Sequence, residues 1–288
     1  MSFWGFVLLR IVANPAANVF QKVLTRRGVG APAVILTTHL LLTTALVGTV
    51  AVLTPVGPGF ASALGASIVL AVVANMLIVA AVRTGDLSIL GPINSYKPVV
   101  SLVPGYLLLG ERPTPAGLCG IALVVVGSYG LMPGGSNRSR LGNLARDRSV
   151  RLRVAALVLS ALEAVFLKQA LRSAGATTTF VYWSIGGLPV ALAVVAARAR
   201  GGFAADVAGL RSAVGAAVAL AAATGLMQWS TLVVLADLQV GYSLALFQLS
   251  SVLAVVFGAV FFGEPHFRRR LVGSLVMVGG AVSIMLGR

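Results

Sequence analysis

The chain has 288 residues, of which 58% are hydrophobic and only 10% are charged, and its mean hydropathy is +0.98. These values lie far outside those of ordinary water-soluble domains and exclude a soluble globular protein. The formal net charge of +15 would suit nucleic acid, but the basic residues lie in short segments between apolar runs and form no single basic face, so we expect no nucleic-acid partner.

Apolar runs long enough to cross a bilayer follow one another along the chain. A hydrocarbon core about 30 Å thick requires roughly 20 helical residues. The runs are too long for membrane strands and lack their strict alternation, so each predicts a transmembrane helix. The first run has neither a basic start nor a clear cleavage site, and we expect it to be a helix rather than a signal peptide. The ten predicted spans are 3–24, 33–53, 60–82, 87–109, 116–132, 152–171, 178–197, 213–235, 238–262 and 271–286.

The basic residues indicate an orientation. Fifteen of the 22 lie in the odd-numbered connections between these spans and three in the even-numbered connections and termini. The positive-inside rule therefore places the odd-numbered connections in the cytoplasm and both termini outside.

The two halves of the chain resemble each other. A shift of 153 residues superposes Gly110 and Glu111 on Gly263 and Glu264, and near the start of each half a shift of 146 superposes Lys22 on Lys168. The other matches at these shifts are Asn75 with Gln228, Gly105 with Gly258, Gly120 with Gly273, Gly127 with Gly280, Phe20 with Phe166 and Arg26 with Arg172. Because each half has five predicted helices, an odd number, the second half enters the membrane in the opposite sense, which predicts an inverted repeat typical of secondary transporters.

The segment GPINSYKPVVSLVPGYLLLGERPTPAGLCGIALVVVGSYGLMP, residues 91–133, resembles the fourth and fifth helices of an EamA repeat, a family of the drug/metabolite transporter superfamily. The resemblance rests on the mid-span Pro98, the Gly-Glu-Arg corner that starts at Gly110, and the glycine spacing of the next helix. The second half repeats this pattern more loosely, with Gly263, Glu264 and Pro265 at the corner.

The resemblance implies two five-helix EamA-type repeats around a central cavity, in an all-α integral membrane protein that moves metabolites or drugs, often outward. We expect the repeats at 1–132 and 152–288, joined by a basic linker at 133–151. Members of the family usually have both termini in the cytoplasm, opposite to the charge prediction, so the orientation stays open.

Polar residues at membrane depth are the candidate substrate-binding groups, since they are costly in lipid and mark pathways or packing contacts. Arg10, Asn14 and Asn18 share one face of the first helix. They line a cavity or, alternatively, Arg10 extends to the headgroups while the amides bind neighbouring helices. The complete candidate set is Arg10, Asn14, Asn18, Asn75, Asn94, Tyr96, Lys97, Glu163, Gln228 and Trp229.

Lys97 and Glu163 allow two interpretations. Lys97 attracts an anionic substrate while Glu163 binds an amino group or carries a coupling proton, or else the two neutralise each other as a buried ion pair. The other conspicuous polar residues are interpreted as structural: Glu111 and Glu264 bind nearby arginines, and His39 forms a contact between helices.

Chemical motifs are otherwise absent from the sequence. It has no phosphate-binding loop, no HExxH motif and only one cysteine, Cys119, so we expect neither an enzyme nor a cofactor or metal. The sequence predicts a multi-pass transporter of the inner or plasma membrane, monomeric or homodimeric. It exports or exchanges a small metabolite such as an amino acid or organic anion, with a proton as the candidate coupling ion. The alternatives are a multidrug exporter of cationic compounds and a membrane scaffold.

Overall fold

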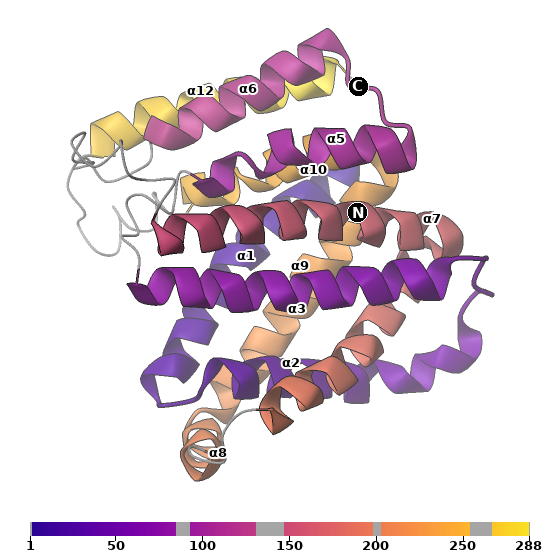
Figure 1. Cartoon of the computed structure of the whole chain (residues 1–288), viewed down its shortest axis with the longest axis vertical. Coiled ribbons are helices and arrows are strands. Elements are labelled where there is room, and N and C mark those ends of the chain that lie inside the picture. Colours follow the sequence, from indigo (N-terminus) through magenta and orange to yellow (C-terminus); the bar gives the residue numbers. More distant parts are fainter. Residues whose placement is uncertain (1, 85–92, 131–146, 198–202, 254–266, 288) are drawn as a thin grey trace. The chain divides into compact units, whose positions relative to one another are not determined.

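The structure, a computed structural model, describes residues 2–84, 93–130, 147–197, 203–253 and 267–287 (Figure 1). Within these ranges all regular elements are helical, which confirms the all-α class. The elements are α1 (Phe3–Arg26), α2 (Ala31–Leu46), the 3-10 helix η1 (Val47–Val52), α3 (Phe60–Thr84), α5 (Lys97–Leu109), α6 (Pro115–Gly130), α7 (Arg148–Ala196), α8 (Phe203–Ser212), α9 (Val214–Asp237), α10 (Val240–Phe247) and α12 (Phe267–Leu286).

Several helices are suited to a membrane. Among the described residues, four helical stretches are long and apolar enough to cross it, namely Phe3–Arg26, Ala31–Ala51, Phe60–Ile78 and Val214–Asp237. Shorter apolar helices cover Pro115–Tyr129, Val240–Leu253 and Val272–Leu286. The helices therefore agree with an integral membrane protein, whereas the count of ten spans stays a prediction.

Two predicted spans, 152–171 and 178–197, belong to the long element α7, which is broken at Gly175 by a φ of 75° and a ψ of 172°. A positive φ favours glycine because it has no side chain to clash. The carbonyl groups before the break gain donors from the loop that follows η1. Thr54 Oγ1 donates to the carbonyl of Ala174 at 3.2 Å, and the Gly57 N–H donates to that of Ser173 at 2.9 Å.

The connection expected at 198–212 contains a helix that the sequence analysis missed, α8. It packs against the turn between α1 and α2. The Asp206 carboxylate accepts a hydrogen bond of 2.6 Å from the Gly30 N–H, at the positive end of the α2 dipole. A methyl group on Gly209 would lie 2.6 Å from the Arg27 carbonyl oxygen, so a glycine is needed for this approach.

Contacts divide the chain into two compact units that draw on both halves of the sequence. Unit 1 contains Met1–Ile68 and Ala170–Ala236, and unit 2 contains Val69–Gln169 and Asp237–Arg288. The predicted repeats are defined by sequence similarity and the units by contacts, so the boundaries 1–132, 133–151 and 152–288 stay predictions.

Within unit 2, α6 and α12 pack so closely that their backbones touch at glycines. A methyl group on Gly120 would lie 2.5 Å from the Gly280 carbonyl oxygen, and one on Gly280 would lie 2.6 Å from the Gly120 carbonyl oxygen. About two turns further along α6, a methyl group on Gly127 would lie 2.7 Å from the Gly273 carbonyl oxygen. Larger residues at these positions would separate the two helices.

Candidate functional site

The polar face of α1 meets α9 within unit 1. Arg10 and Asn14 are partly buried and Asn18 is exposed. The Arg10 guanidinium donates from Nε to Thr231 Oγ1 at 2.7 Å. The Thr231 hydroxyl in turn donates to the Met227 carbonyl at 2.7 Å, so it accepts from the guanidinium through a lone pair. Arg10 is thus held against α9 rather than pointing away from the helices.

Gln228 and Trp229 lie next to this contact. Gln228 is only 8% exposed and precedes Thr231 by three residues, which places the two on the same side of α9. The Trp229 ring packs edge-on against Phe180 of α7, with centroids 5.6 Å apart. The middle part of α9 therefore carries the Gln228 amide and, at the next residue, a tryptophan that belongs to an aromatic pair.

The position of Gln228 along the two helices follows from the packing. Residues of the segments 17–24 of α1 and 217–223 of α9 share an apolar cluster, while Arg10 and Thr231 are bonded in the opposite halves of the same helices. Residue numbers rise along α1 as they fall along α9, so the helices run antiparallel. Gln228 lies on α9 between the apolar cluster and the Arg10 bond.

Three candidate residues of unit 2, Asn94, Tyr96 and Lys97, lie at the start of α5. Lys97 is the first residue of α5 and Tyr96 is its N-cap. The Asn94 carbonyl accepts a hydrogen bond of 3.1 Å from Gln248 Nε2. Lys97 and Glu163 are partly buried and both interact with neighbouring groups, so the two interpretations of this pair stay open.

The other two candidates in unit 2 are exposed. Tyr96 is 43% exposed, and its ring centroid lies 6.0 Å from that of Tyr129. Asn75 is exposed on α3, in a different unit from its repeat partner Gln228.

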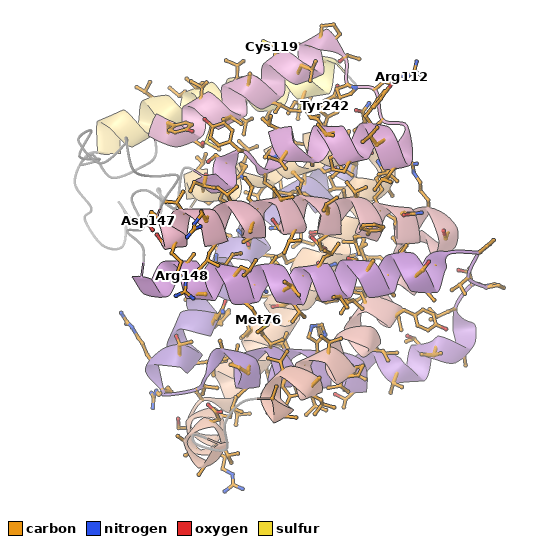
Figure 2. All side chains as sticks on the ribbon, viewed as in Figure 1. Met76, Arg112, Cys119, Asp147, Arg148 and Tyr242 are labelled. Carbon is orange, nitrogen blue, oxygen red and sulfur yellow. The ribbon has the colours of Figure 1, made fainter. Side chains whose placement is uncertain are left out.

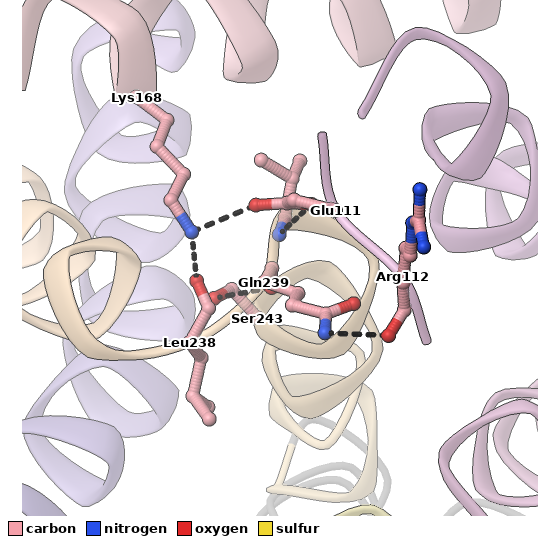
Figure 3. A network of polar contacts seen from close by, with 7 residues as sticks. Glu111, Arg112, Lys168, Leu238, Gln239 and Ser243 are labelled. Carbon is pink, nitrogen blue, oxygen red and sulfur yellow. Dashed lines mark hydrogen bonds and ion pairs between the residues drawn. The ribbon is translucent and has the colours of Figure 1, made fainter. Parts of the chain in front are cut away.

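A buried ion pair lies at the centre of a polar network in unit 2 (Figure 3). Lys168 Nζ of α7 donates to Glu111 Oε1 at 2.7 Å, and both side chains are 7% exposed. The same ammonium donates to the Leu238 carbonyl at 2.6 Å, and Glu111 Oε2 accepts from the Val240 N–H at 2.8 Å. The lysine thus lies at the negative end of α9, and the glutamate at the positive end of α10, where each charge is favoured.

This network corrects the interpretation of Glu111. We expected its carboxylate to bind a nearby arginine, but it forms an ion pair with Lys168, 57 residues further along the chain. The two residues are far apart in sequence, and the repeat related Lys168 only to Lys22. Glu264, the repeat-related glutamate, lies outside the described residues.

More bonds fix the corner between α5 and α6, residues 110–115. Gly110 closes α5 in the left-handed conformation, with a φ of 69°. Gln239 Nε2 donates to the Arg112 carbonyl at 3.1 Å, and the Thr114 N–H donates to the Tyr242 hydroxyl at 2.8 Å. Figure 2 shows Arg112 and Tyr242 at this end of α6. Two residues at the start of α10, Gln239 and Tyr242, therefore fix the corner through hydrogen bonds.

His39 takes the structural role expected from the sequence. Its Nδ1 lies 3.1 Å from the Ser184 carbonyl oxygen, and its ring centroid lies 4.9 Å from that of Trp183. The ring packs directly over Gly187, where a methyl group would overlap it. His39 is a contact between α2 and α7.

The described ranges contain no cluster of side chains that is typical of a metal site. No group of three or more His, Cys, Asp or Glu side chains there could hold an ion.

Comparison with known proteins defines the class. The helices are those of a membrane protein, and residues 4–132 match the model of the EamA-like transporter family. This match confirms, for residues 4–132, the resemblance to the EamA family, which is part of the drug/metabolite transporter superfamily. Members of this family are transporters rather than enzymes.

Solved structures give the fold independently. One described as "Crystal structure of protein" superposes with a TM-score of 0.66, covers 99% of both chains and is 14% identical. At this identity the likeness shows the fold alone. No curated protein matches the chain in sequence.

Proposed function

We propose that the chain is a secondary transporter that exports or exchanges a small metabolite, such as an amino acid or organic anion, by alternating access. In this proposal ten helices form two inverted five-helix repeats around a central cavity in the inner or plasma membrane. The protein works as a monomer or homodimer, and a proton is the candidate coupling ion.

The observation that carries the proposal is the reciprocity of the contacts between α6 and α12. The shift of 153 residues relates Gly120 to Gly273 and Gly127 to Gly280. In the structure each glycine of α6 meets the counterpart of the other: Gly120 lies against Gly280 and Gly127 against Gly273. Such an exchange of partners is the signature of a two-fold axis.

A second set of contacts follows the same rule. Gly127 packs against Met277, and Gly280 packs against Val124. The shift relates Val124 to Met277 and Gly127 to Gly280, so the two contacts are also equivalent. This local two-fold relation is what an inverted repeat produces, and inverted repeats support alternating access in transporters.

The substrate-binding roles are part of the proposal. In this proposal the transported molecule is bound by the polar residues predicted from the sequence, namely Arg10, Asn14, Asn18, Asn75, Asn94, Tyr96, Lys97, Glu163, Gln228 and Trp229. In this proposal Lys97 binds an anionic group, and Glu163 binds an amino group or carries the coupling proton.

Transport by variants in proteoliposomes tests these roles. We expect Lys97→Ala and Glu163→Gln to reduce the initial rate at least about tenfold, equivalent to losing roughly 1.4 kcal/mol of binding. Arg112→Gln, at an exposed side chain, is the matched control and retains the wild-type rate. Full transport by both folded variants would remove Lys97 and Glu163 from the site, and transport of cationic drugs alone would favour the multidrug alternative.

A further inference from the structure

Gln228 is 8% exposed as a whole residue, and its amide makes no hydrogen bond within the described part of the chain, although neither amide atom is fully enclosed there. Its side chain has two N–H donors and an acceptor oxygen. Fully buried amides in native proteins are nearly always hydrogen-bonded, whereas the two amide atoms of Gln228 keep access to open space. A ligand in that space can therefore supply the hydrogen-bond partners of the amide.

A guanidinium is held beside this amide. Arg10 bonds to Thr231, which lies three residues from Gln228 on the same side of α9. Because the Thr231 proton is directed to the Met227 carbonyl, the hydroxyl fixes the guanidinium without competing for its donors. A guanidinium has five N–H donors, enough to bond both to the protein and to a ligand.

The two groups lie well inside the apolar region. Arg10 is seven residues from the start of α1 and Thr231 is six residues from the end of α9, so each is about 10 Å from its helix end at 1.5 Å per residue. A cation at this depth is costly and is retained where it serves a function, commonly by binding an anion.

We propose that Arg10 and Gln228 together bind the carboxylate group of the transported molecule, an inference that rests on the proposed function. Guanidinium N–H groups match the two oxygens of a carboxylate, and the Gln228 amide supplies a further donor. The adjacent pair of Trp229 and Phe180 offers an aromatic surface to the apolar part of the same molecule.

The ligand class is tested by equilibrium binding to the purified full-length chain. Acetate, phenylacetate, leucine and phenylalanine serve as probes, each beside the amide made from it. Replacing Trp4 and Trp183 by Phe leaves Trp229 as the fluorescent reporter, since the chain has three tryptophans. We expect at least one carboxylate to bind at least about tenfold more tightly than its amide. Absence of this preference throughout the series, or tighter binding of cationic compounds, overturns the proposal.

Gln228→Leu gives the sharpest variant test. Leucine removes an amide that has no bond within the described residues, so the thermal midpoint should stay or rise while the carboxylate binds about tenfold more weakly. A structural role for the amide predicts the opposite, a lower midpoint with unchanged binding. Arg10→Lys keeps the charge but loses the planar pair of donors and should also weaken binding. Arg211→Lys, on the exposed surface of α8, is the control and should bind as the wild type does.

Binding and transport are measured separately, so their failures are distinguishable. Carboxylate binding that depends on Gln228, in a protein that transports nothing, would support this inference and contradict the proposed transport function. Transport with the same carboxylate affinity in wild type and Gln228→Leu would support the transport function and contradict this inference.

Discussion

Replacing Lys168 by Met should destabilise the folded protein by about 3–5 kcal/mol, the usual cost of leaving one partner of a buried ion pair alone. The Glu111 side chain is only 7% exposed, so its carboxylate would be left buried without its cation. The Leu238 carbonyl would also lose the hydrogen bond that it accepts from Lys168. Glu111→Gln should cost a similar amount because it leaves the ammonium buried. The measurement is the unfolding transition of each purified variant in detergent.

The double variant Lys168→Met/Glu111→Gln separates ion pairing from simple loss of contacts. It removes both charges, and the new amide oxygen can still accept from the Val240 N–H. We expect it to be more stable than either single variant. A loss equal to the sum of the single losses would contradict coupling between the two charges. Arg112→Gln, next in sequence and exposed, should change stability by less than about 0.5 kcal/mol.

Substitution at Gly280 should also lower the stability of the folded protein substantially. In Gly280→Ala the added methyl would lie 2.6 Å from the Gly120 carbonyl oxygen and 2.9 Å from the Leu123 side chain. Backbone atoms cannot move aside as a flexible side chain can, so α6 and α12 must separate, at a cost of about 1–3 kcal/mol. The thermal midpoint should fall, and Gly280→Leu should lower it further.

The neighbouring residue is a matched control. Gly279 lies on the same helix, but a methyl group there meets nothing within 4 Å. Alanine has the higher helix propensity by roughly 1 kcal/mol, so Gly279→Ala should leave stability unchanged or raise it. Equal destabilisation by both alanine variants would contradict close packing at Gly280.

The sequence was sufficient to predict features that depend on local pattern. The long apolar runs predict helices, and the break in α7 falls at Gly175, inside the connection expected between two spans. Gly110 ends α5 at the predicted Gly-Glu-Arg corner because glycine tolerates the left-handed conformation there. The family followed from the same corner and its glycine spacing, and the match over residues 4–132 confirms it.

Features that depend on tertiary packing were missed or misassigned. Helix α8 has ten residues, too few to span a bilayer, and is held by Asp206 and Gly209 against a distant turn. The partner of Glu111 is a lysine from another helix, chosen by the fold over arginines nearer in sequence. The repeat matched Lys168 with Lys22 and Glu111 with Glu264, so the charged positions were visible, but their pairing was not.

The most direct test of the transport function is solute counterflow in proteoliposomes, with the carboxylate that binds most tightly as the radiolabelled solute. In an alternating-access carrier, the binding site reorients faster when solute is bound than when it is empty. Unlabelled solute on the opposite side should therefore accelerate efflux of the label, and the rate should saturate. Flux that rises linearly with concentration and ignores solute on the opposite side, or no flux above protein-free vesicles, would contradict the account.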